Sequence, residues 1–167
     1  MYVRAAAVIL MVLCGAFCGM NSSEKLRKRG DICLEIGRML RICEFSIRSC
    51  EAEVYSIVSR LKAAELSMLT FLNELPESYE ENGDFHDKWR TSVQKCSGFA
   101  AEEKTLLIEI GASLGTSDSE GQLRALAVYQ TRAQELYELR EAEYRTKGRL
   151  YRSLGLLAGV TVGIIAI

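Results

Sequence analysis

The sequence predicts an all-α protein: a helical bundle with two long helices and several short ones, flanked by an N-terminal and a C-terminal transmembrane segment. Three observations support this fold class. Only one of the 167 residues is a proline, Pro76, and the chain is rich in Leu, Ala, Glu, Arg and Lys, which favour helices. Apolar residues recur every three or four positions through long stretches, which is typical of amphipathic helices. The chain is apolar at both ends, whereas charged residues, which make up 26% of the sequence, are concentrated between them.

Two uncharged segments are candidates for membrane anchors. Ala5–Met20 would form about 24 Å of helix and Leu154–Ile167 about 21 Å, at roughly 1.5 Å per residue. Both are shorter than the hydrocarbon core of a bilayer, which is about 30 Å thick. Thinning of the bilayer or snorkelling by Arg4 and Arg152 would make up the difference. We therefore expect three regions: anchors at residues 1–20 and 153–167, and a helical domain at residues 21–152.

Basic residues follow the first apolar segment and precede the second. They are Lys25, Arg27, Lys28 and Arg29 on one side, and Arg145, Lys147, Arg149 and Arg152 on the other. Positive charge beside a membrane span holds that side in the cytoplasm. We therefore expect the middle of the chain to be cytoplasmic and both termini to lie outside. Contact of these basic residues with anionic lipid headgroups is compatible with that arrangement.

A cleaved signal peptide is the alternative interpretation of the first segment, and it would leave an exported helical protein. The lipoprotein pattern is not met, because Leu13 precedes Cys14 and Phe17 precedes Cys18 where a small residue is required. The basic residues directly after the segment also argue against export. The mass of the mature chain would distinguish the two interpretations.

The middle of the chain predicts a series of helices. One apolar stripe indicates a single long helix through Ile32, Ile36, Met39, Cys43, Ile47, Cys50, Val54, Ile57, Leu61, Ala64 and Met68. Pro76 would end its continuation Leu69–Leu72, and the acidic stretch Glu77–Asp84 is typical of a loop. Two short helices are expected next, Phe85–Cys96 with Trp89 and Val93 on one face, and Glu102–Leu114 with Leu106, Leu107 and Ile110.

A sharp local signal separates the last short helix from the second long one. Gly115 fits the left-handed position after a helix end, where only glycine avoids a Cβ clash. Ser117, with Glu120 three residues later, predicts a capping box that opens the next helix. That helix carries residues at helical spacing and could run into the final apolar segment: Leu123, Leu126, Ala133, Tyr137, Tyr144 and Tyr151.

The sequence offers no constellation typical of an enzyme. We find no phosphate-binding glycine loop, no nucleophile elbow and no cluster with metal-ligand spacing, so no catalytic, cofactor or metal residue is predicted. The only histidine, His86, is expected on the surface at a helix start. A formal net charge of -1 does not indicate nucleic-acid binding, and no small-molecule substrate is expected.

The six cysteines are expected to be reduced and to bind no metal. None shows the two-residue spacing of a zinc or redox motif. Cys43 and Cys50 are seven residues apart on one face of the predicted helix, where cysteine serves as a small hydrophobe. Four late tyrosines leave two interpretations open, a partner surface or a bundle core with solvated hydroxyls: Tyr129, Tyr137, Tyr144 and Tyr151.

Three stretches of the sequence form recognisable motifs. The stretch Ile110–Asp118, followed by Gly121-Gln122, resembles the Gly-x-x-Leu-Gly-x-x-Asp signature of the stage III sporulation protein AB family. Leu150–Gly159 is similar to the family's entry into a C-terminal anchor, and Glu51–Val54 resembles its Glu-x-Glu-Ile stretch. The signature residues are Gly111, Leu114, Gly115, Ser117, Asp118, Gln122, Ser153, Leu154, Gly155 and Gly159. One departure is Ser59-Arg60-Leu61, where the family has Thr-Pro-Leu and a break in the first helix.

The resemblance implies a function that composition does not. Members of this family sit in the mother-cell membrane that faces the forespore, within a channel-like complex similar to secretion systems. Their helical domain is similar to the cytoplasmic domain of the type II secretion platform protein. The resemblance therefore implies a non-enzymatic platform subunit whose partners are the membrane, the ATPase subunit and other stage III sporulation proteins. Whether the chain forms a homo-oligomer is left open, and a generic membrane-anchored scaffold unrelated to sporulation is the alternative.

Glycines in both apolar segments suggest how the anchors pack. Gly155, Gly159 and Gly163 recur every four residues, and Gly15 and Gly19 share that spacing. Small residues allow close approach of helix backbones in lipid. The prediction is that these faces pack against each other or against another subunit, although glycine is also common in membrane spans.

Overall fold

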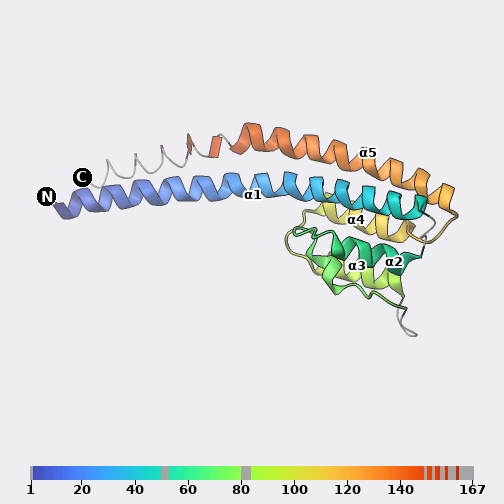
Figure 1. Cartoon of the computed structure of the whole chain (residues 1–167). Helices are drawn as coiled ribbons and strands as arrows, with labels where there is room; N and C mark the ends of the chain where they lie inside the picture. Colours follow the sequence, from blue (N-terminus) through green and yellow to red (C-terminus); the bar gives the residue numbers. More distant parts are fainter. Residues whose placement is uncertain are drawn as a thin grey trace. The chain divides into compact units, whose positions relative to one another are not determined.

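A computed structural model describes residues 2–49, 53–79 and 84–148, together with the single positions 150, 151, 153, 154, 157 and 161 (Figure 1). The described residues form helices and connecting turns, and contain no strand, so the all-α prediction is confirmed. The chain divides into two compact units. One consists of residues 1–30 and 138–167, and the other, called here the helical unit, of residues 31–137.

Five α-helices and one short 3₁₀-helix contribute to the helical unit. They are α1 (Tyr2–Arg48, of which residues 31–48 belong to this unit), α2 (Val54–Ala63), η1 (Thr70–Glu74), α3 (Phe85–Lys95), α4 (Ala101–Ser113) and α5 (Ser119–Glu143, up to residue 137). The two short helices α3 and α4 confirm the predicted helices at Phe85–Cys96 and Glu102–Leu114 to within one residue at each end. The bundle of long and short helices follows the prediction, apart from its first long helix.

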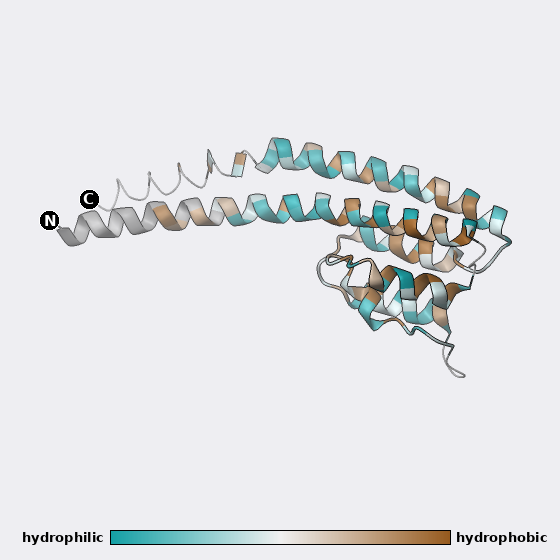
Figure 2. Cartoon of the chain, viewed as in Figure 1, coloured by the Kyte–Doolittle hydropathy of each residue, from teal (hydrophilic) through white to brown (hydrophobic). Residues whose placement is uncertain are grey.

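An apolar core holds the helical unit together. Figure 2 shows hydrophobic residues concentrated where α1 to α4 face one another, whereas much of α5 is hydrophilic. Aromatic rings fill the centre of this core, and the Phe71 and Trp89 ring centroids lie 5.1 Å apart in an edge-to-face arrangement. Such pairs add about 0.5–1.5 kcal/mol beyond the burial of their area. The largest fully buried side chains include Trp89, Phe71, Ile36, Met39, Leu40, Ile57, Leu61, Leu107 and Ile110.

The prediction of one unbroken helix from Ile32 to Met68 is wrong. The helix α1 ends at Arg48, and the chain is extended at Glu53 before α2 begins at Val54. At the end of α1, the Ser49 hydroxyl and amide both donate to the carbonyl oxygen of Phe45, at 2.9 Å and 3.0 Å, and such back-bonding by a serine hydroxyl slightly destabilises a helix. The apolar stripe persists across the break because both helices bury their apolar faces in the same core.

The continuation of that helix through Leu72 is also wrong. After α2, Glu65 adopts a left-handed conformation with φ of 49°, and the chain turns. The buried carboxylate of Glu35, on α1, accepts hydrogen bonds from the Met68 amide at 2.8 Å and the Ser67 hydroxyl at 3.2 Å. These bonds give the polar groups of Ser67 and Met68 a partner in a turn where no helix supplies one. The segment then forms η1, and Pro76 follows it as expected.

A polar bond joins α1 to α5 inside the helical unit. The Gln130 amide nitrogen donates to Glu44 Oε2 at 2.8 Å, across 86 positions of sequence. This hydrogen bond and those from Arg48 lower the pKa of Glu44 below its ordinary value. Arg132 of α5 pairs with Glu109 of α4. The described part of α5 in this unit is therefore tied to both α1 and α4.

The other unit contains the beginning of α1 and the end of α5, which leads into a π-helix, η2 (Tyr144–Gly148). A Cβ built on Gly148 would lie 3.0 Å from the Ser23 hydroxyl, so these two segments approach closely. No helix within the described ranges is both long enough and apolar enough to cross a membrane. Both transmembrane segments stay predictions, and the glycines Gly155, Gly159 and Gly163 lie outside the described residues.

The buried thiol of Cys43 gives a test of this packing. Burial raises its pKa to about 12, so the reactive thiolate is almost absent in the folded chain. A maleimide should therefore label the half-buried Cys96 of the full chain well before Cys43, as measured by mass spectrometry of the digested protein. Cys43→Ala should cost about 1–3 kcal/mol of unfolding free energy, since it leaves a small cavity. Equal labelling rates for the two thiols in the folded chain would contradict the described core.

Candidate functional site

The sequence signature Gly111–Gln122 spans the end of α4, the turn that follows and the start of α5, and α3 packs against its first residue. A Cβ built on Gly111 would lie 2.2 Å from Cδ1 of Trp89 and 2.3 Å from its Nε1, so no side chain fits there. The Trp89 indole nitrogen donates to the Leu107 carbonyl oxygen at 2.7 Å. Gly111 thus lets the indole lie directly against the backbone of α4.

A second bond fixes the same pair of helices. Nδ1 of His86 donates to the carbonyl oxygen of Gly111 at 2.9 Å, because a carbonyl can only accept. Two residues earlier, the Asp84 carboxylate accepts from the His86 amide and caps the start of α3. His86 was expected on the surface, and instead it is half-buried and engaged with the backbone of α4.

The end of α4 follows the predicted geometry. Leu114 is buried in the core, and Gly115 adopts the predicted left-handed conformation with φ of 75°. A Cβ at Gly115 would also lie 2.7 Å from a methyl group of Val54. Glycine is therefore required here both for its backbone conformation and for its lack of a side chain.

The predicted cap of the next helix is one residue too early. The helix α5 begins at Ser119, and the Asp118 carboxylate accepts from the Gly121 amide at 3.0 Å. The cap is therefore Asp118, while the Ser117 hydroxyl makes only a 3.4 Å contact with the carbonyl oxygen of Asp118. An aspartate also places negative charge at the positive end of the helix dipole, which favours it over serine.

The buried side chain of Gln122 closes the turn from inside. Its amide oxygen accepts from the Gly115 amide at 3.1 Å, and its amide nitrogen donates to the Ser117 carbonyl oxygen at 2.8 Å. The carboxamide replaces the backbone partners that the turn lacks. The sequence indicated Gln122 as part of the motif but did not predict this role.

The remaining signature residues lie at the end of the chain. Ser153 and Leu154 are exposed, whereas Gly155 and Gly159 lie outside the described residues. The structure thus brings six of the predicted residues together at the α4–α5 turn: Gly111, Leu114, Gly115, Ser117, Asp118 and Gln122. It describes no contact that would assign a role to the C-terminal motif.

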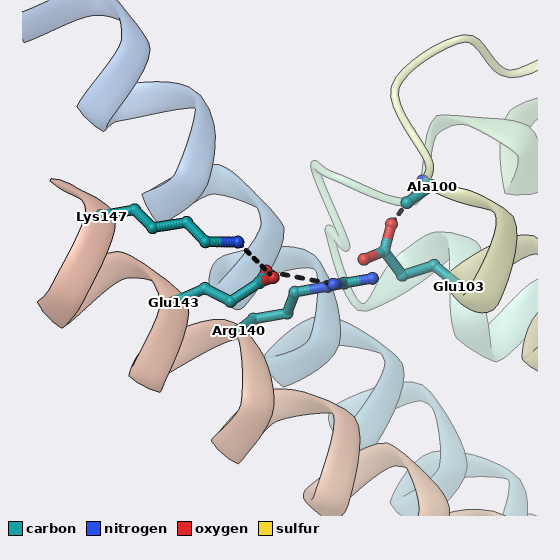
Figure 3. Close-up of polar contacts among 5 residues, drawn as sticks. All are labelled: Ala100, Glu103, Arg140, Glu143 and Lys147. Atoms are coloured by element: carbon teal, nitrogen blue, oxygen red, sulfur yellow. Dashed lines mark hydrogen bonds and ion pairs between the residues drawn. The ribbon is translucent and has the colours of Figure 1, made fainter. Parts of the chain in front are cut away.

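Two further carboxylates accept the hydrogen bonds that Figure 3 shows: Glu103 accepts from a backbone amide, and Glu143 accepts from two basic side chains. In the helical unit, buried Glu103 accepts from the Ala100 amide at 2.5 Å and stabilises the start of α4. In the other unit, Glu143 accepts from Lys147 and from the buried Arg140, each at 3.2 Å. Both hydrogen bonds lower the pKa of Glu143 below its ordinary value, and the one from Lys147 has the larger effect.

The residues that could hold a metal are dispersed. Within the described ranges, no group of three or more His, Cys, Asp or Glu side chains gathers closely enough to bind an ion. Cys33 and Cys43 are buried in α1, as expected for small hydrophobes, and Cys50 lies outside the described residues. Of the late tyrosines, Tyr129 is partly buried against the core and Tyr151 is exposed.

The fold and the α4–α5 turn define a helical protein in which the signature residues of the turn serve its architecture. The chain matches the family model described as stage III sporulation protein AB over residues 4–167, and it belongs to that family. This membership implies a role in stage III sporulation. No match was found among curated proteins or among solved structures.

The position of the cap can be tested by two substitutions. Asp118→Ala should lower the unfolding free energy of the full chain by about 0.5–2 kcal/mol, because the Gly121 amide loses its acceptor. Ser117→Ala should have little effect and serves as the matched control. Urea unfolding followed by circular dichroism would measure both. The opposite order of effects would restore Ser117 as the cap.

The close contact at Gly111 predicts a coupled pair of substitutions. Gly111→Ala should destabilise the chain by about 1–3 kcal/mol, because the new methyl group displaces the indole of Trp89. Trp89→Ala removes all three ring atoms that would clash, Cγ, Cδ1 and Nε1, but also the bond to Leu107. The double variant should therefore be more stable than the sum of the two single effects predicts. Simple additivity in urea unfolding would contradict this contact.

Proposed function

We propose that the chain is a non-enzymatic membrane platform subunit of the stage III sporulation channel complex, and that its helical unit docks a cytoplasmic ATPase. Membership of the stage III sporulation protein AB family supports the sporulation part of this proposal. The platform role and the ATPase come from the resemblance of that family to secretion systems, which is an argument from analogy.

The distribution of charge is the observation that carries the proposal. Residues 1–30 and 138–167 contain ten basic and four acidic residues, and the helical unit contains eleven basic and eighteen acidic residues. The formal net charges are therefore +6 and -7. A basic region beside two apolar segments suits an anionic membrane surface. An acidic helical unit is repelled by that surface and is suited to a protein partner.

Membrane vesicles of known orientation would test topology and docking together. Inside-out vesicles that contain the full chain should retain the purified ATPase subunit from the same organism, because they expose the cytoplasmic side. Right-side-out vesicles with the same chain, and inside-out vesicles without it, are the controls. Retention by right-side-out vesicles alone would overturn the topology, and retention by neither orientation would overturn the docking.

A further inference from the structure

An exposed stripe runs along α1 within the helical unit. Its four residues are Leu34, Arg38, Arg41 and Phe45, spaced by four, three and four positions, so they share one face of the helix. Leu34 is 42% exposed and Phe45 is 63% exposed, which is high for large apolar side chains at the two ends of one surface. The stripe is therefore apolar at its ends and basic in its middle.

The two arginines of the stripe are unneutralised. Among the described residues, neither Arg38 nor Arg41 makes an ion pair or a hydrogen bond. By contrast, five other basic side chains of the unit pair with carboxylates: Arg48, Lys62, Arg90, Arg124 and Arg132. A unit with an excess of carboxylates thus leaves two adjacent cations available on one helix face.

The surface beside the stripe is hollowed on both sides. A groove of about 370 Å³ is lined by Arg38, Arg41, Ile42, Phe45, Ala64 and Leu66. The guanidinium of Arg60 lies 5.9 Å from the centre of the Phe45 ring and covers one face of it. A second hollow of about 240 Å³, between α1 and α5, includes Leu34, Gly37 and Arg41. Arg41 therefore borders both hollows.

We propose that this stripe is the docking surface for the cytoplasmic partner, and that the partner presents a helix with two carboxylates between apolar side chains. The carboxylates would pair with Arg38 and Arg41, and the apolar side chains would pack on Leu34 and Phe45. Charge complementarity of this kind guides association and fixes register. The inference rests on the proposed function, since it names the surface through which the platform would hold its ATPase.

A second copy of this chain fits the stripe poorly. Among the described residues of the helical unit, the other helix with an exposed large apolar side chain is α5, which carries Val128 and Glu135 on one face. Between them lies Arg132, and it is already paired with Glu109. That face offers one carboxylate and one cation where two carboxylates are needed, so a different protein is the better occupant.

Gly37 provides a way to block the stripe while keeping the fold. It lies between Leu34 and Arg41 on the same face, and a Cβ built there meets no atom within 4 Å. Gly37→Leu should leave the helical unit intact, because glycine is unfavourable inside a helix. The new side chain would nevertheless stand where a docked helix must approach.

The test measures retention of the purified ATPase subunit by inside-out vesicles that contain the full chain. The variant R38E/R41E and, separately, Gly37→Leu should each weaken retention by about tenfold or more. Lys95→Glu is the matched control, since Lys95 is exposed, unpaired among the described residues and on α3, outside the grooves. Circular dichroism of each variant should be unchanged.

The outcomes of this test separate failure of the stripe as a docking surface from failure of the proposed function. Unchanged retention in both stripe variants, with normal retention by the wild-type chain, would overturn this inference and leave the proposed function intact. Loss of self-association instead, measured by light scattering in detergent, would identify the stripe as an interface between copies and also overturn it. Absence of retention by the wild-type chain would overturn the proposed function and, with it, this partner.

Discussion

The contact between the indole of Trp89 and the backbone at Gly111 constrains the rest of the helical unit. Because position 111 has no side chain, α3 can approach α4 closely enough for the indole to bond the Leu107 carbonyl. The rings of Phe71 and Phe85 then pack around the same indole, with centroids 5.1 Å and 5.8 Å away. A larger residue at 111 would move the indole, and with it the aromatic centre of the core.

The α4–α5 turn extends this constraint to the last long helix. Gly115 reverses the chain, Asp118 restarts the helix, and Gln122 fills the interior with two bonds to the turn backbone. Because the signature residues serve backbone geometry and packing, the motif acts as a structural element. The turn leads into α5, which Gln130 joins to Glu44 of α1 within the helical unit.

The sequence predicted features with local causes and missed those with long-range causes. The helices α3 and α4 and the left-handed Gly115 follow from periodicity and from glycine stereochemistry, and both predictions hold. The break after Arg48 was missed, because no proline or glycine marks it and the stripe continues through a core shared by two helices. The role of Gly111 depends on an indole 22 positions away, although a glycine inside a helix is itself a signal of close approach. The arginines of the α1 stripe gave no signal, since only the structure shows which cations lack partners.

Trp89 is the only tryptophan in the chain, so its fluorescence reports directly on the contact that organises the core. The account predicts a blue-shifted emission maximum for the full chain and almost no quenching by iodide, because the indole is 1% exposed. On addition of urea, the loss of this signal should coincide with the loss of helical circular dichroism, as expected for one cooperative core. A red-shifted, readily quenched tryptophan in the absence of denaturant would contradict the account.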